Sequence, residues 1–131
     1  LPQISGLREL LTSINLPKAI LTNGPKFHAE RVLDFYNISD CFTNIYGIVE
    51  NNLKGKPHPE SYLNLLQKEK FVLEETLFFD DHPKYVSGFM NVGGFSILVD
   101  RNLEFQDYKF PKGKMKTIQS IFEIPDLLKK L

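Results

Sequence analysis

The chain has 131 residues, 42% of them hydrophobic and 24% charged, a balance that is ordinary for one globular domain with a buried core. Sixteen Lys and Arg residues balance sixteen Asp and Glu residues, so no overall field favours nucleic acid or a membrane surface as a partner. No apolar run is long enough to span a bilayer. The single cysteine, Cys41, excludes an internal disulfide and favours a reducing compartment, so we expect a cytoplasmic protein.

Helical and strand-like segments alternate along the chain. In order, the patterns predict helix 5–14, strand 18–22, helix 26–36, strand 43–49, helix 60–68, strand 76–79, helix 83–91, strand 95–99, a short strand 116–122 and helix 126–131. Ser5 is expected to cap the first helix, and Pro125 stands at the start of the last. This alternation predicts an α/β fold with a parallel sheet and helices on both of its faces.

The residues that follow each strand are the candidates for function, because ligands of parallel sheets bind at the carboxyl ends of the strands. The first strand ends in "LTNG", which places Thr22 before Asn23 and Gly24. A threonine hydroxyl and free N–H groups in a turn can hold a phosphate. Taken alone, however, Asn-Gly fits a simple turn better.

A lysine stands in the loop after the second strand, in the stretch "LKGKPHPESY". Lys56 lies between Gly55 and Pro57, two residues that shape the backbone, and Pro59 then opens a helix. A lysine held in this way can direct its ammonium group inward. A solvated loop lysine is an equally good interpretation of this stretch alone.

Two adjacent carboxylates, Asp80 and Asp81, end the apolar strand in "TLFFDDHP". Neighbouring like charges repel, so a positive partner is needed to stabilise them there. A hard cation such as Mg²⁺ prefers oxygen ligands and suits the pair. The structural alternative is that Asp81 caps the next helix and Asp80 is solvated.

The three stretches together resemble the motifs of the haloacid dehalogenase (HAD) superfamily of phosphatases. "ILTNG" is similar to its second motif, "GKPHPESY" to its third and "LFFDD" to its fourth, and the closing "IQSIFEIPDLL" also resembles the usual ending. The resemblance implies a Rossmann-like, HAD-like core domain over 1–131. "FFDD" and "LTNG" resemble most the pyrimidine 5′-nucleotidase-like branch.

The resemblance implies Mg²⁺-dependent hydrolysis of a small phosphomonoester, such as a nucleotide, through an aspartyl-phosphate. Thr22, Asn23 and Gly24 would bind the phosphate, and Lys56 would also bind it and stabilise charge in the transition state. Asp80 and Asp81 would bind Mg²⁺, with Asp81 as the direct ligand and Asp80 acting through water or orienting Lys56. No catalytic role is assigned to the histidines, which are His28, His58 and His82.

The superfamily's first motif is an Asp-x-Asp whose first Asp is the nucleophile, and these residues do not contain it. Asp100 in "LVDRNLE" follows an apolar strand, but Asn102 takes the place of the second acid. The opening "LPQISGLRELLTSINLP" resembles the segment that follows the superfamily's cap domain. We therefore expect the first strand, the nucleophile and the cap to precede Leu1. Residues 1–131 alone would then be inactive and would leave two strand edges unpaired.

Three other functions are compatible with parts of the sequence. A non-catalytic HAD-like binding domain, or a degenerate fragment, would need no nucleophile. A phosphate-receiving regulatory domain also places paired acids at strand ends, but there the pair should follow the first strand. Dehalogenation occurs in the superfamily without Mg²⁺, so the acid pair argues against it.

Overall fold

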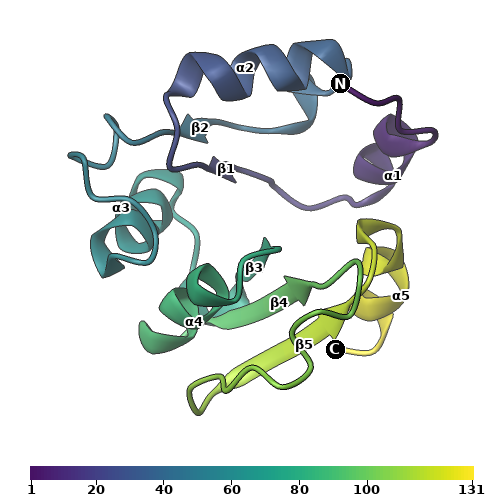
Figure 1. Ribbon diagram of the computed structural model, residues 1–131. Coiled ribbons are helices and arrows are strands. Elements are labelled where there is room, and N and C mark those ends of the chain that lie inside the picture. The colour runs from purple at the N-terminus through teal and green to yellow at the C-terminus, as the bar shows by residue number, and fades with distance from the viewer. The chain divides into compact units, whose positions relative to one another are not determined.

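The computed structural model describes residues 1–131, which form two compact units, the N-terminal unit Leu1–Gly55 and the C-terminal unit Lys56–Leu131 (Figure 1). The N-terminal unit contains α1 (Leu7–Ser13), β1 (Ile20–Leu21), α2 (Lys26–Phe35), η1 (Ser39–Cys41) and β2 (Ile45–Tyr46). The C-terminal unit contains α3 (Pro59–Glu69), η2 (Leu73–Glu75), β3 (Leu77–Asp80), α4 (Pro83–Asn91), β4 (Phe95–Val99), β5 (Lys114–Ile118), η3 (Ile121–Glu123) and α5 (Ile124–Lys129). This order confirms the predicted α/β class with parallel strands.

The sheet of the N-terminal unit is a short parallel pair. Ile20 lies opposite Ile45, and α2 packs on β2. The assigned strands are shorter than the predicted 18–22 and 43–49, but backbone hydrogen bonds extend the pairing at both ends. The N–H of Thr43 donates to the carbonyl of Lys18 at 2.7 Å, and the N–H of Thr22 donates to the carbonyl of Tyr46 at 3.0 Å.

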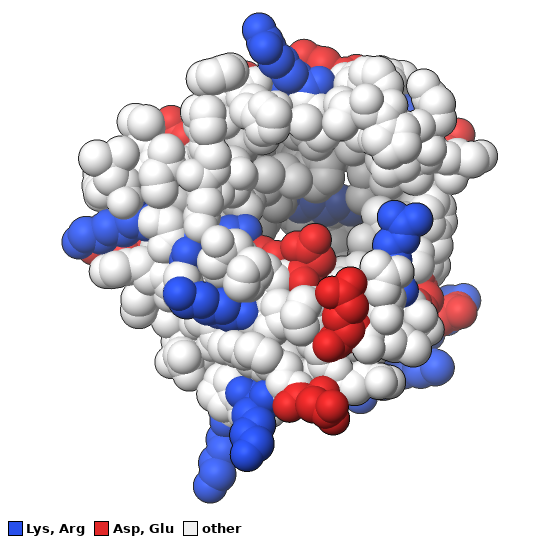
Figure 2. All heavy atoms as spheres, in the orientation of Figure 1, with Lys and Arg blue, Asp and Glu red and all other residues white.

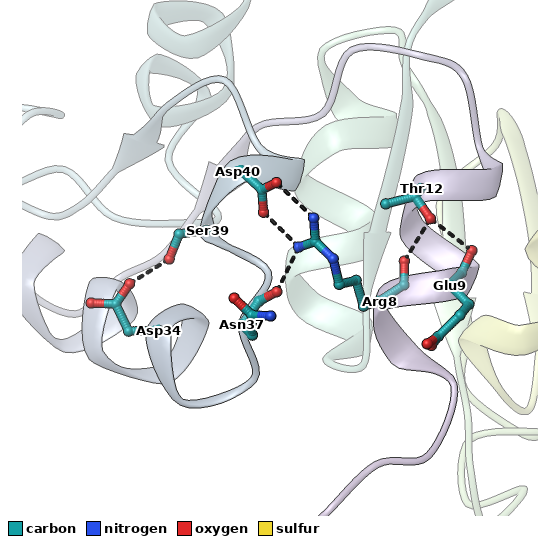
Figure 3. Close-up of polar contacts among 7 residues, drawn as sticks. All are labelled: Arg8, Glu9, Thr12, Asp34, Asn37, Ser39 and Asp40. Atoms are coloured by element: carbon teal, nitrogen blue, oxygen red, sulfur yellow. Dashed lines mark hydrogen bonds and ion pairs between the residues drawn. The ribbon is translucent and has the colours of Figure 1, made fainter.

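An ion pair fastens α1 to η1 (Figure 3). The guanidinium of Arg8 donates to both carboxylate oxygens of Asp40, at 2.7 and 2.8 Å, and also to the carbonyl of Asn37 at 2.7 Å. The helix begins later than predicted, because Gly6 and not Ser5 is the N-cap. Gly6 has a φ of 78°, a left-handed conformation that glycine adopts without the cost of a Cβ.

The sheet of the C-terminal unit has the order β3-β4-β5, and all its strands are parallel. Helix α4 packs against β3 and β4 (Figure 1) and buries Val86 and Met90 against Leu98 of β4. Strand β5 starts earlier than the predicted 116–122 and ends at Ile118, because Ser120 and Glu123 form a capping box that starts η3.

Histidine side chains cap the two helices that begin with proline. The Nδ1 of His58 accepts the N–H of Glu60 at 3.1 Å, and the Nδ1 of His82 accepts the N–H of Lys84 at 3.2 Å. The alternative that Asp81 caps α4 is therefore wrong. The proline that follows each histidine has no N–H, so the first N–H that needs an acceptor lies two residues beyond the cap.

Each sheet keeps open edges within its unit. β3 pairs only with β4, and β1 and β2 pair only with each other. Although Leu77, Phe78 and Phe79 are apolar, the side chains of β3 are only half-buried.

None of the helices combines the length and the hydropathy needed to cross a bilayer. On the face drawn in Figure 2, acidic and basic side chains lie side by side among uncharged atoms.

Candidate functional site

A buried ion pair lies at the carboxyl end of β3. Asp80 is the last residue of that strand, and its Oδ2 lies 2.7 Å from the Nζ of Lys56. The two side chains are only 9% and 10% exposed. The other carboxylate oxygen of Asp80 accepts the N–H of His82 at 3.0 Å, just before α4. The structure thus brings together two of the predicted site residues, and Asp80 orients Lys56.

Aromatic side chains surround the ammonium group of Lys56. Its Nζ lies 5.0 Å from the ring centre of Tyr85 and 5.6 Å from that of Phe78, both within cation–π range. These rings replace part of the lost hydration of the ammonium group. Sequence reasoning missed both residues as parts of the site. Their nearness in sequence to Asp80 was a usable signal, since both lie within five residues of it.

Tyr62 of α3 contacts both aromatic residues of this shell. Its hydroxyl donates to the carbonyl of Tyr85 at 2.6 Å, and its ring meets that of Phe78 edge to face at 5.4 Å. Burial, and then the charges of Asp80 and Tyr85, raise the pKa of Tyr62. The phenol therefore stays protonated and remains a hydrogen-bond donor.

Gly88 allows α4 to approach Tyr62 and Pro57 closely. A Cβ at this position would lie 2.7 Å from the Cβ of Pro57 and would overlap the hydroxyl oxygen of Tyr62. Pro57 follows Lys56 directly, through a cis peptide bond. The segment that carries the lysine is therefore packed tightly against α4.

Asp81 differs from Asp80 in being exposed to solvent. Mg²⁺ is commonly bound by one or two carboxylates, with water and substrate phosphate completing the shell, so the pair fits this ion. Asp80 already holds Lys56 and an N–H group, which leaves Asp81 as the more accessible ligand. No group of three or more His, Cys, Asp or Glu side chains is arranged to hold a metal ion. The metal role of the pair remains a prediction.

The predicted phosphate-binding residues Thr22, Asn23 and Gly24 lie in the N-terminal unit, at the carboxyl end of β1. The sequence predicted free N–H groups in this turn, but the N–H of Gly24 donates to the Oγ1 of Thr22 at 3.1 Å. Asn23 packs on Gly55, where a Cβ would lie 2.7 Å from the Asn23 Oδ1. The turn is thus ordered by its own side chains, and its phosphate role remains a prediction.

Asp100 has a different role from the other strand-end acids. It is buried after β4, and its two carboxylate oxygens accept the N–H groups of Glu104 at 2.8 Å and Phe105 at 3.0 Å. Both oxygens therefore hold the loop that follows the strand.

Comparison with known proteins places these residues in a family. The family model described as haloacid dehalogenase-like hydrolase matches residues 2–93, a range that contains the "LTNG", "GKPHP" and "FFDD" stretches.

Several solved structures have the same fold. One is the magnesium-bound HAD-hydrolase YfnB from Bacillus subtilis, with 18% identity, a TM-score of 0.82 and coverage of 96% of this chain and 55% of that one. The L-2-haloacid dehalogenase from Xanthobacter autotrophicus has 17% identity, a TM-score of 0.83 and coverage of 97% and 61%. A HAD phosphatase from Thermococcus onnurineus has 22% identity, a TM-score of 0.77 and coverage of 98% and 57%.

The chain spans between 55% and 61% of the length of these three proteins. At this level of identity the structures establish the Rossmann-like core fold alone. None of the three proteins is described as a nucleotidase. The family model matches most of the chain, including the buried Lys56–Asp80 pair and Asp81. The chain belongs to the haloacid dehalogenase-like hydrolase family.

Proposed function

We propose that the protein is a Mg²⁺-dependent phosphatase that hydrolyses a small phosphomonoester. The observation that carries the proposal is the buried Lys56–Asp80 pair, with the exposed acid Asp81 as the next residue in the chain. A buried ion pair is weak as a stabilising device, because desolvation costs about as much as the attraction gains. A charge-stabilising site for a phosphoryl group gives this arrangement a purpose.

The reaction would proceed in two displacements on phosphorus. The carboxylate of the Asp expected before Leu1 would attack the phosphorus, and the ester P–O bond would break. The leaving oxygen would take a proton from the second acid of the Asp-x-Asp motif, which would regain one from the attacking water in the next step. Water then attacks the phosphorus of the aspartyl-phosphate, which releases inorganic phosphate and restores the carboxylate. Lys56 would stabilise the negative charge that the nucleophile and the phosphoryl oxygens share. The resemblance gives Thr22 and Asn23 the role of donating hydrogen bonds to those oxygens.

The fixed position of Lys56 is what Asp80 contributes to this chemistry. Its hydrogen bond and the rings of Tyr85 and Phe78 hold the ammonium group in one place before substrate arrives. Asp81 would hold Mg²⁺, with Asp80 assisting through water, and the ion would neutralise phosphate charge and orient the nucleophile. A nucleotide is the substrate that the resemblance to the nucleotidase-like branch favours.

Two other functions give different experimental results. Dehalogenases are among the proteins with this fold, and a dehalogenase would act on a haloacid without added Mg²⁺. A binding domain would turn over neither substrate. The adjacent carboxylates of Asp80 and Asp81 favour the metal-dependent phosphatase over both.

The test of this proposal is Asp81→Asn in the full-length native protein. We expect phosphatase activity at saturating Mg²⁺ to fall at least about a hundredfold, because a metal ligand is lost. Folding should be unaffected, because Asp81 is exposed. Asp126→Asn, which changes an exposed acid of α5, is the matched control and should keep full activity. Full activity and unchanged Mg²⁺ dependence in Asp81→Asn would remove Asp81 from the metal site.

A further inference from the structure

An apolar cavity of about 290 Å³ opens beside Asp81 in the C-terminal unit. It is lined by Asp81, His82, Pro83, Lys84, Phe105 and Tyr108. The first two residues join β3 to α4, the next two begin α4, and the two aromatic ones belong to the segment that joins β4 to β5 (Figure 1). The cavity therefore shares Asp81 with the proposed metal site and brings in two aromatic side chains that the proposed reaction does not use.

The segment that carries the two aromatic residues is held in a defined conformation. The buried carboxylate of Asp100 accepts the N–H groups of Glu104 and Phe105, and the carbonyl of Asp100 accepts the N–H of Leu103 at 3.2 Å. Leu103 has a φ of 54°, an unfavourable left-handed conformation that its surroundings must stabilise. The buried carboxylate of Asp100 thus fixes the backbone position of Phe105 in the loop.

Tyr108 is the exposed wall of the cavity. Phe105 and Phe110 pack against the core residues Val86, Met90 and Leu98 and so anchor the loop on both sides of Tyr108. The N–H of Tyr108 donates to the carbonyl of Phe105 at 3.1 Å, and its ring lies 4.7 Å from that of Phe110. Tyr108 as a whole residue nevertheless remains 42% exposed, so it is positioned and still accessible to a ligand.

His82, another lining residue, is also held in place. The ring of His82 stacks on that of Tyr85, with ring centres 4.2 Å apart, and its Nδ1 accepts the N–H of Lys84. Two contacts therefore set the orientation of the imidazole. A flat group that enters the cavity would meet ordered aromatic surfaces, with the charged side chains of Asp81 and Lys84 also in the lining.

We propose that this cavity binds a single planar ring of the substrate and so makes the protein selective for phosphomonoesters that carry an aromatic or heteroaromatic ring. The inference rests on the proposed phosphatase function, since it places the ring beside the metal-binding acid. A dry cavity of about 150 Å³ is known to hold benzene, so 290 Å³ is enough for one ring. Stacking on preorganised aromatic side chains favours such a ring over an alkyl chain.

The experiment compares the binding of phenylphosphonate and methylphosphonate, neither of which can be hydrolysed, to the full-length protein in Mg²⁺ by calorimetry. We expect the wild type to prefer phenylphosphonate, and Tyr108→Ala to reduce that preference about three- to tenfold, the range for loss of one aromatic contact. Tyr108→Phe keeps the ring and should keep the preference. Phe122→Ala removes an aromatic side chain that is equally exposed, at 45%, and should change nothing.

The outcomes separate this inference from the proposed function. An equal preference in the wild type and Tyr108→Ala, or no preference in the wild type, overturns the ring site even if phosphatase activity is present. Intact ring selectivity without Mg²⁺-dependent hydrolysis of either phenyl phosphate or uridine 5′-monophosphate supports the site and overturns the phosphatase. If KM for uridine 5′-monophosphate also rises in Tyr108→Ala, the ring is a nucleotide base. If only phenylphosphonate is affected, the ring is bonded directly to the phosphate.

Discussion

The two units contain ion pairs of equal length in opposite surroundings. Arg8 and Asp40 in the N-terminal unit, and Lys56 and Asp80 in the C-terminal unit, are each 2.7 Å apart. The side chains of the first pair are 38% and 67% exposed, whereas those of the second are 9% and 10% exposed. Water and salt screen the first pair, so it contributes little to stability. In the second pair each charge depends on the other. Distance alone therefore does not distinguish the two pairs, but burial does.

Among the variants that test this comparison, removal of one buried charge should lower the free energy of unfolding most. Asp80→Ala leaves the ammonium group of Lys56 buried without its carboxylate. We expect the free energy of unfolding of the full-length protein to fall by about 3–5 kcal/mol, measured by urea denaturation. Phosphatase activity should be lost as well, because Lys56 is no longer oriented.

The matched control replaces both charges with apolar groups of similar size. The double variant Lys56→Met with Asp80→Leu should unfold at a urea concentration at least as high as the wild type, since neither desolvated charge remains. Activity should still be absent. If the single Asp80→Ala variant lost less than about 1 kcal/mol, the pair would behave like an exposed one, and the contrast between the units would be wrong.

The sequence predicted the C-terminal unit better than the N-terminal unit. Helix 83–91 and strand 95–99 have the predicted limits, because the turn residues Pro83 and Gly93 mark them clearly. The strands of the N-terminal unit have two residues each, three of their four side chains are only half-buried, and backbone hydrogen bonds continue the pairing beyond them. Alternation of elements was sufficient for the fold class, whereas element length depends on tertiary packing.

The charged residues of the candidate site could be predicted from the sequence, but the aromatic side chains that surround them could not. Adjacent acids after an apolar strand and a lysine between Gly55 and Pro57 identified Lys56 and Asp80. The rings of Phe78 and Tyr85 are close in sequence to Asp80 but far from Lys56, so their contacts with the lysine join distant parts of the chain. The same holds for the loop that brings Phe105 to the cavity beside Asp81. The histidine caps were not predicted. Aspartate is the more common N-cap, so Asp81 was the candidate for α4, although a His-Pro pair also supplies an acceptor and a helix start.

The close packing around Lys56 predicts a second, smaller difference between the units. Gly88→Ala would push a methyl group into Tyr62 and Pro57, so we expect a loss of about 1–3 kcal/mol in unfolding free energy. Gly24→Ala in the N-terminal unit would meet only the Thr22 Oγ1 at 3.6 Å, an ordinary contact. It should change stability by no more than about 0.5 kcal/mol. Equal losses in the two variants would show that the packing around Lys56 is no tighter than that of the turn.

The smallest effect is expected at the exposed ion pair. The hydrogen bond from Arg8 holds the pKa of Asp40 below its ordinary value, and the same bond raises the pKa of Arg8. Because the folded pKa of Asp40 is depressed, the pair contributes above the unfolded pKa of Asp40, and the contribution is lost as pH falls through the folded pKa. Asp40→Asn should therefore lower Tm slightly at neutral pH and low salt, while Arg8 still donates to the carbonyl of Asn37.

Salt is the variable that distinguishes this pair from the buried one. High salt should remove the difference in Tm between Asp40→Asn and the wild type, because exposed charges are screened. The same salt should leave most of the loss caused by Asp80→Ala, since solvent ions do not reach a pair whose side chains are about nine-tenths buried. Asp107→Asn, which changes an exposed acid with no ion pair, controls for the change in net charge. A salt-independent loss in Asp40→Asn as large as that in Asp80→Ala would mean that burial does not separate the two pairs.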